Sequence, residues 1–339
     1  MIAILHIAKM FPHEGDSQLG SFVKSHIEAV SEHPHVIALL DHKGKLESSG
    51  DVHVFGTRDW SIIQKVNLMV LHVKQKGVQL VHFHGYGNDI GVLSMVCRWM
   101  KIPYVHTEHG SMFLAGSDRI PTGIKKNLLL RHFANAARVM PVSQLLADGI
   151  LALSPQAKID VVPNIIKTPE PHSQRSKAFC VVADAVFDVK RQDLILKAFR
   201  AARLVDWELH FIGGGPDLKK LEEMAAPYFE ISVLGRLPHA SVLERIGQYH
   251  GLALFSTHET FGMVVLEGLA AGLHVASTSH VGCAPFATEG VTWCDSTEDL
   301  TQFFIDASRK NTGTQKIFSE LSAVEIGQKI QSIYDSVIS

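Results

Sequence analysis

The segment GLALFSTHETFGMVVLEGLAAG, residues 251–272, sets the pattern for the rest of the chain. Its first six residues form an apolar run short enough for a buried strand, and after Gly262 the apolar residues have the spacing of a helix packed against a sheet. We therefore expect Glu259 in a loop and Glu267 about one turn into a helix. The amides of the first helical turn face the same space as the carboxylates, so the junction suits a ligand with both an anion and hydroxyl groups, such as a sugar nucleotide.

Short apolar runs alternate with helical patterns along the whole chain. Such alternation implies parallel sheets covered on both faces, and ligands of these sheets bind at the carboxyl ends of the strands. The expected class is α/β, with Rossmann-like, doubly wound sheets. Expected strands cover residues 2–7, 36–40, 80–84, 104–107, 138–141, 159–164, 178–183, 208–212, 231–234, 251–256 and 275–277. Expected helices cover residues 21–30, 60–76, 90–100, 124–136, 190–202, 300–307 and 315–337, with others that start near residues 143, 216 and 263.

The length of 339 residues exceeds what one hydrophobic core usually serves, so we expect two domains. The polar, proline-bearing stretch 167–176 is the clearest linker. The expected domains are therefore an N-terminal domain of residues 1–166 and a C-terminal domain of residues 167–321. The last helix, about residues 322–339, is expected to pack back on the first domain.

The composition indicates a soluble globular enzyme. Apolar residues make up 46% of the chain and charged residues 19%, and the net charge of −2 predicts no nucleic-acid partner. The four cysteines form no C-x-x-C pair, so we expect reduced, mostly buried thiols without a zinc or redox motif. The first residues have the pattern of a strand; we expect neither a signal peptide nor a transmembrane helix, and a cytoplasmic location.

Histidines follow two of the expected strands. His82 and His84 share a face of their strand, as a metal pair would, but the sequence identifies no third ligand, and we expect packing there and no metal. His109 precedes Gly110, which lets the backbone approach a ligand closely. Packing and ligand contact both remain open for His109.

Cations that could bind a phosphate group lie in the second half. Lys190, Arg236 and the amides of residues 261–264 could meet on one diphosphate. A solvated lysine and a dipole-stabilised surface glutamate are the ordinary alternatives for Lys190 and Glu267. The Thr-Phe-Gly loop between the two glutamates favours the functional interpretation.

Several of these segments together resemble the family 4 glycosyltransferases, which have the GT-B fold. The run from Ser256 to Gly272 resembles the family signature of two glutamates separated by seven residues. Further segments follow in family order: VVPN at 161–164, FIGGGP at 211–216 and VLGRLP at 233–238, after Gly20 at a helix start, VHFH at 81–84, TEHG at 107–110 and VMPVS at 139–143. The resemblance covers nearly the whole chain.

The resemblance implies transfer of a sugar from a nucleotide donor with retention at the anomeric carbon and without a metal ion or another cofactor. It also implies that the domain of residues 1–166 binds the acceptor and that the domain of residues 167–321 binds the donor. It assigns catalytic contacts to His109, Lys190 and Glu259. It implies donor binding by Gly20, Arg236, Leu237, Thr260, Phe261, Gly262, Met263, Val264 and Glu267.

Individual roles follow from the same resemblance. Glu267 would hold the ribose hydroxyls, and Lys190 would neutralise the departing diphosphate. Glu259 and His109 would contact the donor sugar, and the Gly20 loop would let the diphosphate approach. The residues at 236–237 would hold the base, and the amides of residues 261–264 would bind sugar and phosphate.

Three positions depart from the family pattern. Ala185 stands where the family usually has an arginine five residues before the lysine, and Arg191 is the nearest cation that could compensate. Ile165 replaces the glycine of the P-N-G turn. The stretch VGCAPF at 281–286 replaces a glycine-rich segment with a following glutamate.

The leading hypothesis is a retaining hexosyl- or N-acetylhexosaminyl-type glycosyltransferase of bacterial surface polysaccharide synthesis. Its donor would be a UDP-sugar rather than a GDP-sugar, and its acceptor a saccharide or a lipid-linked saccharide. The alternatives are a catalytically weak GT-B partner subunit and a GT-B sugar-nucleotide epimerase. Lys125, Lys126, Arg131 and His132 form a modest basic face, which leaves open either a solvated face or peripheral contact with the inner face of the membrane.

Overall fold

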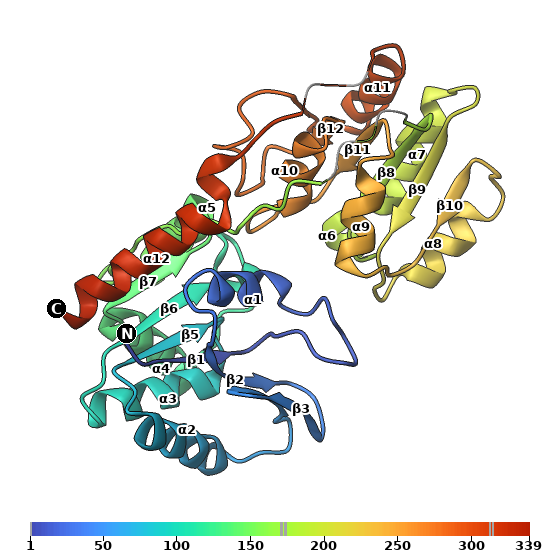
Figure 1. Cartoon of the computed structure of the whole chain (residues 1–339). Coiled ribbons are helices and arrows are strands. Elements are labelled where there is room, and N and C mark those ends of the chain that lie inside the picture. The colour runs from blue at the N-terminus through green and yellow to red at the C-terminus, as the bar shows by residue number, and fades with distance from the viewer. Residues whose placement is uncertain (1, 170–171, 173–174, 312, 314) are drawn as a thin grey trace. The chain divides into compact units, whose positions relative to one another are not determined.

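The computed structural model describes residues 2–169, 172, 175–311, 313 and 315–339 (Figure 1). It divides into two compact units, Met1–Ile165 with Glu320–Ser339, and Ile166–Ser319. Part of the expected linker, residues 170–171 and 173–174, lies outside the described residues.

A sheet of seven described strands forms the centre of the first unit, in the order β3-β4-β2-β1-β5-β6-β7. All neighbours pair in parallel except β3 and β4. The strands are β1 (Ile4–Ala8), β2 (His35–Leu40), β3 (Lys45–Ser49), β4 (Val52–Gly56), β5 (Leu80–His84), β6 (Tyr104–Glu108) and β7 (Arg138–Pro141). The central strands are buried along almost their whole length because helices cover both faces of the sheet.

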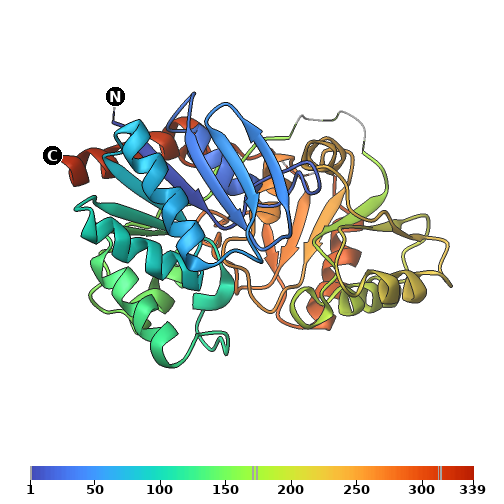
Figure 2. The same cartoon turned by 90° about the horizontal axis from the view of Figure 1, so that it is seen from below.

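Figures 1 and 2 show α2, α3 and α4 side by side on one face of this sheet, while α1 and α12 lie on the other. The described helices of this unit are α1 (Ser21–Glu28), α2 (Ile62–Lys76), α3 (Asn88–Trp99), α4 (Gly123–Asn135), α5 (Gln144–Leu153) and α12 (Ala323–Ile338). Side-chain oxygens of Ser61, Ser143 and Ser322 accept backbone hydrogen bonds at the starts of α2, α5 and α12. The C-terminal helix α12 packs against α1.

The second unit has a parallel sheet of six described strands in the order β10-β9-β8-β11-β12-β13. These strands are β8 (Ala178–Val182), β9 (Glu208–Ile212), β10 (Ile231–Val233), β11 (Gly251–Leu254), β12 (His274–Ser277) and β13 (Val291–Trp293). The helices are α6 (Phe187–Lys190), α7 (Gln192–Ala202), α8 (Leu218–Ala225), α9 (His239–Ile246), α10 (Met263–Ala270) and α11 (Thr297–Ser308). One core cluster joins alternate residues of β8 and β9, on one face of the sheet, to apolar residues of α7, α8 and α11.

The sequence located most elements within a few residues. Strands β5, β7 and β9 have the expected bounds. The hairpin of β3 and β4, the strand β13 and the helix α9 were not expected, because their segments are polar or short and resemble loops. The segment expected as a strand at residues 159–164 is not a regular strand. Ile159 forms an isolated bridge to Val139, and the amide of Val162 donates to the carbonyl of Pro141 at 3.0 Å, so the segment follows β7 only loosely.

The helix expected to open at Lys190 is also divided differently. Lys190 is the last residue of the short helix α6, and Arg191 adopts a left-handed conformation, with φ of 52°, before α7 begins. The left-handed residue interrupts the helical hydrogen bonding, which the continuous apolar spacing of residues 187–202 did not indicate. Lys190 therefore lies in a sharply turned segment after β8.

Several histidines are buried without charge in the first unit. Burial lowers the pKa of His26 from 6.5 to about 4, although its Nε2 lies 3.0 Å from the carbonyl oxygen of Pro163. Burial also lowers the pKa of His109 and of His132 well below the ordinary value, and neighbouring histidines add to both shifts. These imidazoles are neutral in the folded protein at neutral pH.

The stability of the first unit should therefore fall in mild acid. In the unfolded chain the His26 imidazole takes up a proton near pH 6.5, whereas in the folded protein it does so only near pH 4. The folded state therefore has its full stability above pH 6.5 and loses stability relative to the unfolded state as the pH falls toward 4. Each such histidine costs about 1.4 kcal/mol of unfolding free energy per pH unit within that window. Urea unfolding at a series of pH values measures the slope.

Two variants provide the comparison. His26→Gln keeps a donor for the Pro163 carbonyl and should reduce the slope, whereas His33→Gln, at an exposed side chain, should leave it unchanged. A slope that is unaffected by His26→Gln would contradict this explanation.

Candidate functional site

The carboxyl edge of the second sheet gathers most of the expected site residues. Strands β8 and β11 are neighbours, and the chain continues from them to opposite sides of the sheet, to β9 and β12. Loops after such a pair diverge and leave a crevice, which is the usual ligand position in doubly wound sheets. Lys190 follows β8 and Glu259 follows β11, so they come from the two sides of this position.

Lys190 and Glu259 form an ion pair. The Nζ of Lys190 donates to Oε1 of Glu259, and the Oγ of Ser256 donates to the same oxygen at 2.7 Å. The amide of Thr257 also donates to the carbonyl of Val189, at 2.7 Å, and holds the two loops together. Both side chains of the pair are partly exposed, so a ligand can reach them.

Glu267 lies on α10, just beyond the first turn of the helix, as its position in the sequence predicted. Its side chain is buried, and its Oε1 lies 3.2 Å from Nε2 of His239. His239 is the first residue of α9. This pair connects the starts of α9 and α10 at the same edge of the sheet. Only Oε1 of Glu267 takes part in it.

Arg236 follows β10 and meets a carboxylate that the sequence analysis overlooked. Its Nη2 lies 2.9 and 3.1 Å from the two oxygens of Asp184, and the amide of Gly214 donates to Oδ1 of Asp184 at 2.9 Å. Asp184 thus ties the loops after β8, β9 and β10 together. A side chain at Gly214 would collide with this guanidinium, since an added Cβ would lie 2.9 Å from Nε.

The residue that departs from the family pattern, Ala185, is buried in the core of the second unit, 1% exposed. The backbone of Gly215 packs so closely that a Cβ there would lie 2.6 Å from the carbonyl oxygen of Ala185. Because Ala185 is buried, a longer side chain at position 185 would require its neighbours to rearrange. The proposed substitute, Arg191, lies over the ring of Phe255, with Cζ 5.4 Å from the centroid, and Arg236 is a second cation near this loop.

The loop between the two glutamates is held by the segment 281–286, which replaces the family's glycine-rich stretch. The amide of Gly282 donates to the carbonyl of Glu259 at 3.2 Å, and the amide of Cys283 donates to the carbonyl of Phe261 at 2.7 Å. The side chain of Phe261 is buried, so this residue can offer a ligand only its backbone. Thr260, Gly262, Met263, Val264 and Leu237 are partly exposed.

Two expected residues belong to the first unit. Gly20 precedes α1 with φ of 67°, and the ring of Phe22 in that helix lies 4.7 Å from the ring of His109. Glu108 accepts hydrogen bonds from the amides of His109 and Gly110, at 2.9 and 2.7 Å. Among the described residues, neither ring nitrogen of His109 has a hydrogen-bond partner, and a buried polar group in that state suits a ligand contact.

At the edge of the second sheet, the structure therefore groups Lys190 with Glu259, Arg236 with Asp184 and Glu267 with His239. In the first unit, helix α1, which Gly20 precedes, contacts His109 through Phe22. Three residues that the sequence analysis missed each contact an expected residue: Asp184, His239 and Ser256. Glu108, part of the TEHG segment, does so as well. Asp184 and Glu108 directly follow predicted strands, and that position was the available signal.

Two family profiles match adjoining parts of the chain. "Glycosyl transferases group 1" matches residues 165–312, and "Glycosyltransferase Family 4" matches residues 33–169. Together they extend from residue 33 to residue 312.

Curated relatives are similar over part of their length. The phosphatidylinositol N-acetylglucosaminyltransferase gpi3 subunit of Schizosaccharomyces pombe is 24% identical over 298 residues, 79% of this chain and 63% of that protein. The uncharacterized glycosyltransferase MJ1178 of Methanocaldococcus jannaschii is 23% identical over 221 residues, 64% of this chain and 61% of that protein. The chain spans less than two thirds of these relatives.

Solved structures match over nearly the whole chain. Anabaena Alr3699/HepE, determined with UDP and glucose, has a TM-score of 0.75 at 14% identity, over 99% of this chain and 100% of that one. The lipopolysaccharide outer core galactosyltransferase WaaB has a TM-score of 0.69 at 15% identity, over 99% of each chain. These likenesses confirm the expected GT-B fold.

The conformation of Gly20 gives a prediction for the loop before α1. An added Cβ would lie 2.6 Å from the carbonyl carbon and oxygen of Met10, whereas Gly77, with a similar φ of 60°, has nothing within 4 Å of such an atom. Both alanine variants bear the cost of the left-handed conformation, about 1–2 kcal/mol. Gly20→Ala adds a backbone clash and should lose about 1–3 kcal/mol more in urea unfolding. Equal losses in the two variants would contradict the close approach.

Proposed function

The chain belongs to the family 4 glycosyltransferases, and from that premise we propose that it is a retaining enzyme that transfers a hexosyl or N-acetylhexosaminyl group from a nucleotide-diphosphate donor. A UDP-sugar is the favoured donor, and the acceptor is a saccharide or a lipid-linked saccharide of bacterial surface polysaccharide synthesis. The observation that carries the proposal is the Lys190–Glu259 ion pair, which lies where the chain leaves the neighbouring strands β8 and β11 in opposite directions. No metal ion or other cofactor is required in this scheme.

The charges at this edge suit the two halves of the donor. Lys190 lies where it can neutralise the negative charge that develops on the leaving diphosphate. The amides at the start of α10 provide partial positive charge for the same phosphates. The carboxylate of Glu259 lies beside Lys190 and can accept a hydrogen bond from a sugar hydroxyl once the ligand separates the pair.

The base and the ribose have separate contacts. Glu267 has a buried carboxylate on the second turn of α10 that can accept hydrogen bonds from ribose hydroxyls, and His239 orients it. Arg236 and Leu237, after β10, lie where the base is expected. His109, with two unpartnered ring nitrogens among the described residues, is the expected sugar contact from the first unit.

A membrane-bound acceptor would fit a cytoplasmic protein at the inner face of the membrane. No helix in the described part of the chain is long and apolar enough to cross a membrane. Helix α4 carries Lys125, Lys126 and Arg131 together with Ile124, whose side chain is 80% exposed. His132, which was expected on the same basic face, is buried and does not belong to it. A cationic, apolar face of this kind suits peripheral contact with anionic lipids.

A second candidate is a partner subunit with little activity of its own. Ala185 removes one cation of the family pattern, and the similar proteins of Schizosaccharomyces pombe and Saccharomyces cerevisiae are named as subunits of an N-acetylglucosaminyltransferase. This candidate retains the donor site but needs another chain for turnover.

Nucleotide binding tests the donor site directly. UDP should raise the thermal midpoint more than GDP, and at a concentration of about 100 Kd it should stabilise the fold by about 2.7 kcal/mol. Glu267→Gln should weaken UDP binding because the amide accepts ribose hydrogen bonds less strongly than a carboxylate. Glu244→Gln, an exposed glutamate of α9, is the matched control and should bind UDP normally. A larger shift with GDP would reverse the assignment of the base.

Turnover tests the role of Lys190. With a panel of UDP- and GDP-sugars, Lys190→Ala should lower the rate of transfer or of slow donor hydrolysis by about 10²–10³-fold. Lys197→Ala, an exposed lysine of α7 paired with Asp193, should retain full activity. UDP binding without turnover of any donor would favour the partner subunit, and an absence of both would contradict the proposed function.

A further inference from the structure

Three buried histidines meet on the face of the first sheet that α1 and α12 cover. His82 and His84 are alternate residues of β5, and His6 is directly opposite His82 in the parallel pairing of β1 with β5. Since residues in register on neighbouring strands project to the same side, His6 supplies the third imidazole that the sequence could not identify. The three side chains are almost fully buried, with exposures of 0–1%.

The ring nitrogens are close enough to share one ion. One nitrogen from each ring lies within 4.8 Å of the others, and Nδ1 of His6 is 3.1 Å from Nε2 of His84. Two ligands of a tetrahedral ion with bonds of about 2.0–2.1 Å are about 3.3 Å apart, so His6 and His84 already have that separation. The His82 ring stacks on the His84 ring, with centroids 3.8 Å apart, and must turn to complete the set.

The surroundings of His82 provide the hydrogen-bond partners that a ligating histidine needs. Nδ1 of His82 lies 2.6 Å from the hydroxyl oxygen of Tyr334, and Nε2 lies 2.7 Å from the hydroxyl oxygen of Thr107. Whichever nitrogen binds the ion, the other keeps a hydroxyl partner, which fixes the tautomer and the ring orientation. Nδ1 of His84 is buried and has no partner among the described residues, so the cluster still has a polar group to satisfy.

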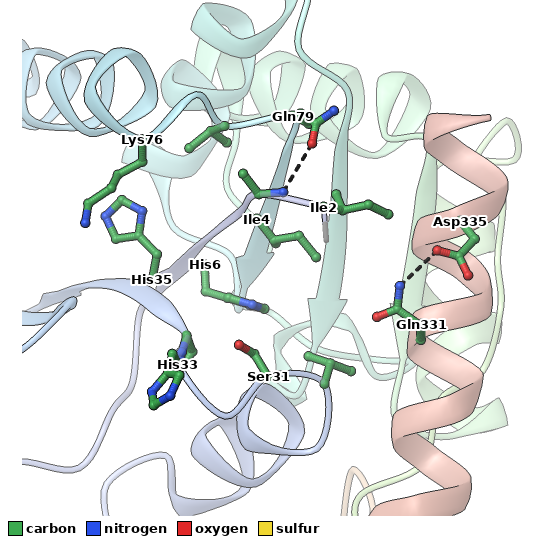
Figure 3. A pocket seen from close by; sticks show the side chains of 14 residues that line it. Ile2, Ile4, His6, Ser31, His33, His35, Lys76, Gln79, Gln331 and Asp335 are labelled. Atoms are coloured by element: carbon green, nitrogen blue, oxygen red, sulfur yellow. Dashed lines mark hydrogen bonds between the residues drawn. The ribbon is translucent and has the colours of Figure 1, made fainter.

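One of the three histidines adjoins a cavity. A cavity of about 860 Å³ opens at the amino-terminal edge of the sheet, and His6 forms part of its wall. Figure 3 shows the imidazole of His6 pointing from β1 toward α12, which carries Gln331 and Asp335. Water in this cavity can fill a fourth ligand position.

The protonation state also suits a metal ligand. Burial lowers the pKa of His6 to about 3, and it lowers the pKa of His82 and His84 well below the ordinary value. Neutral imidazole is the form that binds metal, so protons do not compete at neutral pH.

We propose that His6, His82 and His84 form a transition-metal site inside the first unit, with water from the adjoining cavity as the fourth ligand. Imidazole nitrogens in a tetrahedral arrangement suit Zn²⁺, and Co²⁺ reports the same geometry. The site is separate from the donor site on the second sheet. Its role is structural: the ion joins β1 to β5, and His82 connects it to α12 through Tyr334.

Direct measurement on the full-length protein tests the proposal. The protein is stripped with a chelator and dialysed against Co²⁺ or Zn²⁺ alone. We expect one ion per chain, the absorption spectrum of tetrahedral Co²⁺, and X-ray absorption fine structure that reports three imidazole ligands. Zn²⁺ should raise the thermal midpoint of the stripped protein. Less than one ion per chain, or an ion with fewer than three imidazoles, would overturn the proposal without any variant.

Variants locate the ion. His6→Gln and His84→Gln should each abolish the Co²⁺ spectrum and the Zn²⁺ shift of the thermal midpoint. His132→Gln is the matched control, because His132 is a buried histidine that packs on the opposite face of the same sheet, with Nε2 3.1 Å from Nδ1 of His106. His132→Gln should retain the ion. Metal binding that survives in both His6→Gln and His84→Gln would place the metal elsewhere.

The hydrogen bond between His82 and Tyr334 provides a test that leaves all three proposed ligands unchanged. Tyr334→Phe removes only a hydroxyl and should weaken metal affinity about 10–100-fold. Circular dichroism of each variant establishes that it is folded. Unchanged metal affinity in a folded Tyr334→Phe variant would show that α12 does not support the proposed site.

Discussion

The parallel pairing of β8 with β11 is the constraint on which the candidate donor site depends. Parallel strands end at the same edge of a sheet, and here the chain leaves the two strands in opposite directions. That divergence lets a lysine after one strand meet a glutamate after the other. The backbone bond between Thr257 and Val189 fixes the distance between the two loops, so the ion pair does not rely on side chains alone.

The departures from the family pattern have local physical explanations. Ala185 is buried in the core beside the glycine-rich turn after β9, so a longer side chain there would require its neighbours to rearrange. Lys190, Arg191 and Arg236 then provide the positive charge near the loops that are proposed to bind the donor phosphates. The segment 281–286 binds the loop of the two glutamates through backbone amides, so it supports the same turn by another means.

The first unit contains an unusual number of buried histidines, and they occupy both faces of its sheet. His106 and His132 pack on the α4 side, and His6, His82 and His84 pack on the α1 and α12 side. Each neutral imidazole needs hydrogen-bond partners when it is buried, and histidines supply them to one another. The result is a core whose stability depends on pH and which is well suited to a metal ion.

The sequence by itself determined the alternation of strands and helices, the GT-B class and the position of Glu259 in a loop with Glu267 on the following helix. The strands, the helices and the placement of the two glutamates depend on local periodicity, which neighbouring residues carry. The GT-B class depends on the resemblance of several motifs to the family 4 glycosyltransferases. The tertiary structure alone decided that Asp184 meets Arg236, that His239 meets Glu267 and that Ala185 is buried, because these contacts join residues far apart in the chain. The same reason hid the partner of His82 and His84: only the register of β1 against β5 brings His6 beside them.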